Sequence, residues 1–256
     1  MLRLTKEGAF GYKSKNEDFN KQVIKKWDAM RPKYDNFRDI YTSGQIERNK
    51  LKVRELKGSV EYEPVRAKRA TEAEYIVMSG IHDYLWFGEG VSVVPTNEYD
   101  DFVNKIDLAL SFFDRETKKN LYLGIDVTTA EDPSVMHKKF NDIALNLKNG
   151  KLSQVRYFMP DNPKNDSKGK KEMLRVVVKL KDSEIDDLVE KFAQLKTKKI
   201  EQNPIRLKIL EQIDKQISEA FLYLASWSGT PPDYKDRKDI QQYLEILRKK
   251  IKEINK

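Results

Sequence analysis

The stretch KIDLALSFFDRETKKNLYLGIDVTT, residues 105–129, decides the fold of this 256-residue chain. Two runs of branched and aromatic residues flank the polar segment DRETKK at 114–119, a pattern that predicts a β-hairpin. A hairpin centred on this segment places Asp107 directly opposite Asp126, and strand alternation puts both carboxylates on one face. The other face is expected to carry the apolar residues Ile106, Leu108, Leu110, Leu123, Ile125 and Val127.

The opposed pair Asp107 and Asp126 has a chemical consequence. Two carboxylates facing each other on a sheet repel, and burial adds the cost of desolvation. A divalent cation between them removes both problems, and it can orient a phosphodiester and activate water. The pair therefore predicts a site for Mg²⁺ or Mn²⁺, whereas a shifted hairpin register would leave each Asp merely exposed.

Around the hairpin, the sequence between residues 71 and 180 predicts an α/β core. Thr71–Glu74 reads T-x-x-E, which is typical of a capping box, and is expected to open a helix that ends near residue 86. The other elements are predicted as strands at 91–95, 102–114, 121–129, 152–160 and 174–180, a helix at 133–150 and a polar loop at 161–171.

The flanking segments are expected to be helical. Residues 1–70 are expected to form a basic segment with helices before Pro32 and at about 44–57. This segment ends in the basic linker PVRAKRA at 64–70. Residues 181–256 predict a helical region that ends in a hairpin of two long amphipathic helices. Together with the core at 71–180, these segments make three predicted regions.

Composition excludes several classes of protein. The chain has no Cys and two His, so disulfides, thiolate chemistry and a His-rich zinc site are excluded. It has no apolar run of membrane-spanning length, no secretory signal and no P-loop, dinucleotide-binding turn or nucleophile elbow. The net charge of +8 permits a polyanionic partner, and we expect a cytoplasmic protein without a membrane partner.

The order of a helix, an Asp-bearing strand, a turn, the strand GIDVT and a second helix resembles the core of the PD-(D/E)XK nuclease superfamily. The resemblance covers about residues 71–159. It implies a restriction-endonuclease-like mixed sheet flanked by helices, with an N-terminal helical arm and a C-terminal helical hairpin. It also implies that Asp107, Asp126 and Glu74 hold the metal, with Glu72 as the alternative to Glu74. A capping role alone would also explain Glu74.

The chain departs from the family pattern at the lysine. The position two residues after Asp126 is Thr128, and some family members carry the lysine on the following helix instead. The residues expected to form the buried face of that helix are Met136, Phe140, Ile143, Ala144 and Leu147. At about 100° per residue, Lys139 lies about 80° from the centre of this face and Lys138 about 180° away. Lys139 is therefore expected to reach the site and to act in catalysis, whereas Lys138 is expected in solvent.

These observations predict a metal-dependent nuclease. Its expected substrate is DNA, with RNA as the alternative. The alternative is a non-catalytic nucleic-acid-binding or protein-interaction protein on a decayed nuclease core, which Thr128 favours. A homodimer or a helical protein partner is an alternative use of the apolar stripes on the C-terminal helices. The residues expected to bind nucleic acid are Arg66, Lys68, Arg69, Lys168, Lys170 and Lys171. Further candidates are Asp100, Asp101, His82, His137, Asn104 and Gln154.

Overall fold

The computed structural model describes residues 17–59, 64–114, 116, 118–164, 166–194, 196–226 and 234–254. Its centre is a five-stranded sheet with the order β1-β2-β3-β5-β4. The strands are β1 (Val91–Pro95), β2 (Leu108–Asp114), β3 (Lys119–Thr128), β4 (Ser153–Phe158) and β5 (Gly169–Lys179). Strands β3 and β5 are parallel and the other neighbours are antiparallel, so the predicted α/β fold with a mixed sheet is confirmed.

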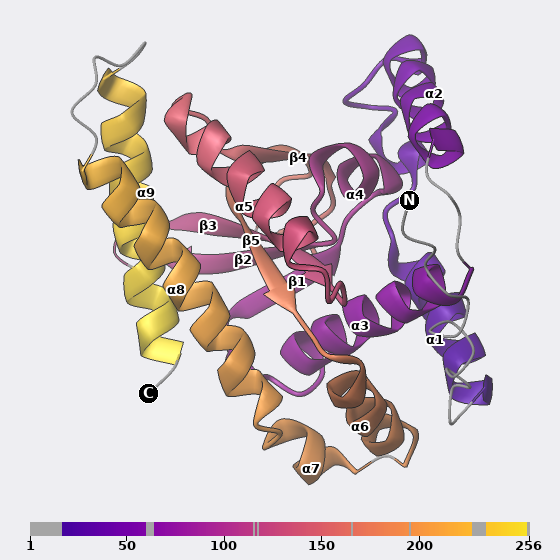
Figure 1. The fold of residues 1–256 in the computed structure, drawn as a ribbon. Helices are drawn as coiled ribbons and strands as arrows, with labels where there is room; N and C mark the ends of the chain where they lie inside the picture. Colours follow the sequence, from indigo (N-terminus) through magenta and orange to yellow (C-terminus); the bar gives the residue numbers. More distant parts are fainter. Residues whose placement is uncertain are drawn as a thin grey trace, which may run out of the picture.

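Helices flank this sheet on both faces. They are α1 (Glu17–Met30), the 3-10 turn η2 (Tyr34–Phe37), α2 (Ser43–Ser59), α3 (Pro64–His82), α4 (Glu98–Asn104), α5 (Pro133–Lys148), α6 (Asp182–Ala193), α7 (Thr197–Glu201), α8 (Ile205–Ser226) and α9 (Tyr234–Ile254). Helices α8 and α9 run side by side at one end of the molecule, and α1 and α2 lie at the other end (Figure 1). No helix in the described part of the chain is long and apolar enough to cross a membrane.

The register of the β2–β3 hairpin is the one predicted from sequence. Leu108 pairs with Ile125, and Leu110 pairs with Leu123. Continued by one residue, this register brings Asp107 opposite Asp126. The backbone N–H of Asp107 donates to the Ile125 carbonyl at 2.9 Å, which holds Asp107 against β3 although β2 itself begins at Leu108.

The apolar face of the hairpin forms the main core. Leu108, Leu110, Leu123 and Ile125 are fully buried, in one cluster with residues of α3, α6, α8 and α9. The buried stripe of the two C-terminal helices belongs to this cluster and includes Ile209, Ile213, Ile217, Leu244, Leu247 and Ile251. The apolar stripes that could have paired with a second subunit are thus buried within the chain's own core.

Ile106 lies on the face opposite to the one predicted. It belongs to a small second cluster with Ala109, Val155, Phe158 and Met173 rather than to the main core. Ile106 precedes β2, so strand alternation does not govern it. Its side chain fills the space over Gly124, where an added Cβ would lie 3.0 Å from Ile106 Cδ1.

Three predicted elements are wrong in type or extent. Residues 64–70 are the first turns of α3 rather than a linker, because Pro64 occupies a first helical position and Thr71 Oγ1 bonds the Ala67 carbonyl inside the helix. The expected boundary at residue 70 therefore falls within α3. Residues 102–104 belong to α4, which the Asn97 side chain caps by accepting from Tyr99 N–H. Strand β5 begins at Gly169, inside the expected loop.

Glutamine side chains of α8 cover the open edge of β5. Beyond the segment that pairs with β4, Val177 N–H donates to Gln216 Oε1 at 2.8 Å, and Gln216 Nε2 donates to the Val177 carbonyl at 2.7 Å. Gln212 bonds the backbone of Lys179 in the same way, at 2.9 and 3.3 Å. The two glutamine side chains thus form the hydrogen bonds to Val177 and Lys179 that a neighbouring strand would otherwise form.

Candidate active site

Four carboxylates from separate elements gather where β3 ends and β2 begins. Asp107 precedes β2, Asp126 lies near the end of β3, Glu74 lies in the middle of α3 and Asp101 lies in α4. The first three are buried, with exposed fractions of 7, 3 and 9%. The charges of Glu74, Asp101 and Asp126 each raise the pKa of Asp107, so the four carboxylates interact electrostatically.

Asp107 is fixed against β3 by the backbone. Its Oδ2 accepts the N–H of Val127 at 2.7 Å, which holds the carboxylate beside Asp126. Burial is the largest cause that raises its pKa well above the usual range, and repulsion from Glu74, Asp101 and Asp126 adds to it. Lys139 acts in the opposite direction but does not compensate.

Asp126 contacts the lysine of α5 that helical geometry selected. Lys139 Nζ donates to Asp126 Oδ1 in an ion pair, while Lys138 is exposed. Arg175 of β5 donates to the Lys139 carbonyl at 3.1 Å and so ties α5 to the sheet at this point. Burial raises the pKa of Asp126, although Lys139 and Arg175 both lower it. Its Oδ2 is buried without a hydrogen-bond partner among the described residues.

Glu74 has no capping role, because α3 begins ten residues earlier, at Pro64. Burial, followed by repulsion from Asp101, raises its pKa to about 8. The alternative Glu72 is buried in an ion pair with Arg69, NH1 to Oε2 at 3.3 Å. Of the two glutamates, Glu74 is therefore the one within the electrostatic field of the Asp pair.

Arg31 is a member of the site that sequence reasoning missed. It follows α1, and its NH2 contacts Asp101 Oδ2 at 2.8 Å while its Nε donates to the Thr96 carbonyl at 3.0 Å. Its charge also acts on Glu74 and Asp107. No local pattern marks this pair, which is separated by 70 residues.

The remaining candidates lie in other environments. Asp100 is buried and accepts from Arg156 N–H at 2.6 Å, Tyr157 N–H at 2.8 Å and Asn104 Nδ2 at 2.7 Å, so it anchors α4 to β4. Burial raises its pKa to about 6. The structure places His82 in an exposed pair with Asp83, His137 and Gln154 in exposed positions, and Thr128 in a buried one.

Four of the six residues predicted to bind nucleic acid are held in ion pairs. Arg69 is buried between Glu72, Asp182 and Asp186. The other three pairs are Lys168 with Asp39 at 2.7 Å, Lys170 with Glu172 at 3.1 Å and Lys171 with Asp166 at 2.8 Å. Lys68 is half-buried on α3, and the side chain of Arg66 lies outside the described residues.

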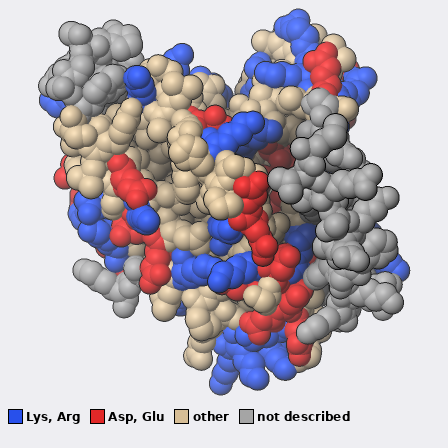
Figure 2. All heavy atoms as spheres, in the orientation of Figure 1, with Lys and Arg blue, Asp and Glu red and all other residues tan. Residues whose placement is uncertain are grey.

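The surface in the orientation of Figure 2 carries charges of both signs. Lys and Arg side chains gather over α2 and at the opposite end, over α7, with Asp and Glu between them (Figure 2). On this face, basic side chains alternate with acidic ones and form no continuous basic track (Figure 2).

The side chains at the site have the chemistry of a hard-cation site without a formed coordination shell. Within the described ranges, no three His, Asp or Glu side chains are arranged to hold a metal ion. Three carboxylates nevertheless have raised pKa values in spite of Arg31, Lys139 and Arg175, and one oxygen of Asp126 is buried with no partner among the residues described. A divalent cation held by Asp107, Asp126 and Glu74 would satisfy both conditions.

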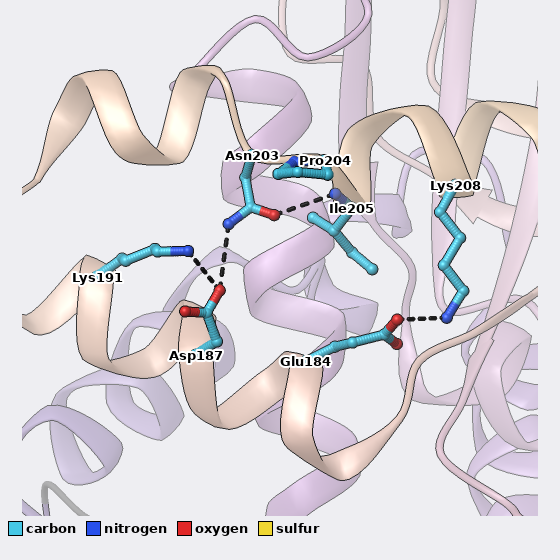
Figure 3. A pocket seen from close by; sticks show the side chains of 7 residues that line it. All are labelled: Glu184, Asp187, Lys191, Asn203, Pro204, Ile205 and Lys208. Carbon is cyan, nitrogen blue, oxygen red and sulfur yellow. Dashed lines mark hydrogen bonds and ion pairs between the residues drawn. The ribbon is translucent and has the colours of Figure 1, made fainter.

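A pocket of about 370 Å³ between α6 and α8 is structural (Figure 3). Its polar side chains already pair with one another: Lys208 contacts Glu184, and Lys191 contacts Asp187. Asn203 Oδ1 accepts Ile205 N–H at 3.0 Å and so caps α8. These contacts join α6 to α8 and leave the carboxylate cluster as the candidate active site.

Comparison of the chain with protein-family models, with curated proteins and with solved structures finds no match. Function is therefore inferred from the site. The relevant geometry is an Asp pair in hairpin register, a lysine from the next helix on one of the pair, and a buried glutamate beside them.

Proposed function

We propose that this chain is a Mg²⁺- or Mn²⁺-dependent nuclease with a restriction-endonuclease-like core. The observation that carries the proposal is the contact of Lys139 with Asp126, beside the opposed Asp107. The PD-(D/E)XK pattern needs an acidic pair with a lysine at one of its members, and α5 supplies the lysine that Thr128 fails to provide. We propose DNA, ahead of RNA, as the substrate, and the cytoplasm as the location of this Cys-free protein.

The roles of the residues follow from their contacts. Asp107, Asp126 and Glu74 would hold the cation, which when bound supplies Lewis-acid activation of a phosphodiester and its water. Lys139 Nζ donates hydrogen bonds at the Asp126 side of the site, where it orients the attacking water or stabilises developing negative charge. Arg31 neutralises Asp101 and thereby limits repulsion across the cluster.

The test is cleavage of labelled single- and double-stranded DNA and RNA in Mg²⁺, Mn²⁺ and EDTA. We expect metal-dependent cleavage that Asp126→Asn and Lys139→Met each reduce by about 100-fold or more. Lys138→Met is the matched control, since it removes an exposed lysine next to Lys139, and it should retain full activity. Cleavage that persists in EDTA or in Asp126→Asn would contradict the proposal.

A second candidate is nucleic-acid binding without cleavage, which Thr128 in place of the family lysine favours. Under this alternative, well-folded protein retards labelled nucleic acid in every metal and cleaves none of it. The same assay therefore separates the two functions. If folded protein neither cleaves nor binds nucleic acid, both functions are excluded and the protein-interaction alternative is left.

A further inference from the structure

A second pocket, of about 600 Å³, lies at the other end of the β1–β2–β3 sheet. Strand residues Ser92, Ser111, Phe113 and Asn120 line one side, and Asp161 and Asn162 of the segment after β4 line another. This volume is within the range of small-molecule sites in proteins. No residue of the carboxylate cluster lines it.

The pocket is separate from the candidate active site. Ser111 lies four residues beyond Asp107 on β2, about 13 Å away along an extended strand. Ala109 lies between them on the same face and is buried in the small apolar cluster with Ile106 and Val155. The pocket and the carboxylate cluster are therefore two separate places on the sheet.

The charge of the pocket argues against an anionic ligand. No Lys or Arg occurs among the described residues that line it, whereas Asp161 and Asp166 both do. Asp166 is already engaged, because it accepts from Tyr122 Oη at 2.7 Å and Lys171 Nζ at 2.8 Å. Asp161 lies 3.8 Å from His82 and is more than half exposed. Among the described lining residues, a phosphate would meet these carboxylates and no Lys or Arg to bind it.

The uncharged side chains of the lining fit a flat heterocycle. The lining offers two hydroxyls, of Ser92 and Ser111, and two amides, of Asn120 and Asn162, which are groups that both donate and accept hydrogen bonds; Asn162 Oδ1 already accepts Lys164 N–H at 3.0 Å. Phe113 is 52% exposed, which is unusual for a large apolar side chain inside a strand, and it offers an aromatic surface for stacking. We propose that this pocket binds the base of a nucleoside, through stacking on Phe113 and hydrogen bonds to the amides and hydroxyls.

The experiment is calorimetric titration of the full chain in EDTA with adenosine, guanosine, cytidine and uridine, and with their 5′-monophosphates. At least one nucleoside should bind, and its monophosphate should bind more weakly because of the acidic lining. Phe113→Ala and Asn162→Ala should each weaken binding by about tenfold. Phe140→Ala is the matched control, because Phe140 is a partly exposed phenylalanine on α5 outside the pocket, and it should leave affinity unchanged.

Three results would overturn this inference. They are the absence of binding by all four nucleosides at millimolar concentration, tighter binding of the monophosphates, and unchanged affinity in Phe113→Ala. Melting temperatures of the variants confirm that each is folded. Asp126→Asn should retain nucleoside binding, so failure of the nuclease proposal and failure of this one are distinguishable.

Discussion

Replacing Glu74 by Gln should remove a large part of the pH dependence of stability in the metal-free protein. Burial and repulsion from Asp101 raise the pKa of Glu74 from 4.5 to about 8. The native state therefore holds a proton that the unfolded state releases above about pH 4.5. A carboxyl with a raised pKa contributes stability that is present below the unfolded pKa and is lost as pH rises through the folded pKa.

The size of the effect follows from the two pKa values. Between pH 4.5 and pH 8, one extra bound proton lowers the free energy of unfolding by about 1.4 kcal/mol per pH unit. Over this interval, the upper limit for Glu74 acting alone is about 5 kcal/mol. Gln resembles the protonated form, so Glu74→Gln should match the wild type near pH 4.5 and exceed its stability at pH 8.

Urea unfolding in EDTA at pH 5 and pH 8 measures this difference. The gap in free energy of unfolding between Glu74→Gln and the wild type should widen toward pH 8. Glu211→Gln, which changes an exposed glutamate of α8, should behave as the wild type at both pH values. An equal gap at pH 5 and pH 8 would refute the reasoning, because Glu74 would then titrate alike in the folded and unfolded chains.

Three further perturbations test other parts of the structure. Mg²⁺ or Mn²⁺ should raise the melting temperature of the wild type but not of Asp126→Asn, and equal shifts would place the cation elsewhere. Gly80→Ala should lower the free energy of unfolding by about 1–3 kcal/mol, because the added Cβ would lie 2.4 Å from the Trp86 ring. Gly→Ala usually stabilises a helix, so a gain in stability here would contradict the close packing of Gly80 against Trp86. Gln216→Leu should cost about 2–4 kcal/mol in urea unfolding by leaving Val177 N–H and C=O unpaired, and a neutral result would mean that the edge of β5 is satisfied otherwise.

The parts of the site that are close in sequence could be predicted. A hairpin with a short turn fixes its register locally, so the opposition of Asp107 and Asp126 follows from the positions of its polar and apolar residues. Lys139 lies on the next helix, where the angle of a residue relative to the apolar face determines whether it meets the sheet. Even so, the apolar face was only partly right, since Phe140 is 39% exposed.

The parts that depend on distant contacts could not be predicted. Arg31 meets Asp101 across 70 residues, and no periodicity or motif in either segment indicates the other. Glu74 was ambiguous because T-x-x-E also occurs inside helices, and only the start of α3 at Pro64 rules out the capping role. The face of Ile106 is not predicted correctly by alternation, because Ile106 lies before the first residue of β2, Leu108.

The carboxylate cluster is hard to explain as a device for stability. Burial of charged groups costs several kcal/mol per ion, and apolar side chains of similar size are often at least as stable in such positions. Here Arg31, Lys139 and Arg175 offset only part of the cost of burial and repulsion, since the pKa values of Glu74, Asp107 and Asp126 remain raised. These acids are kept together, and one oxygen of Asp126 has no hydrogen-bond partner in the part of the chain that the structure describes; a bound cation would remove the cost of this arrangement. This cost to stability supports the proposal that the cluster holds a cation.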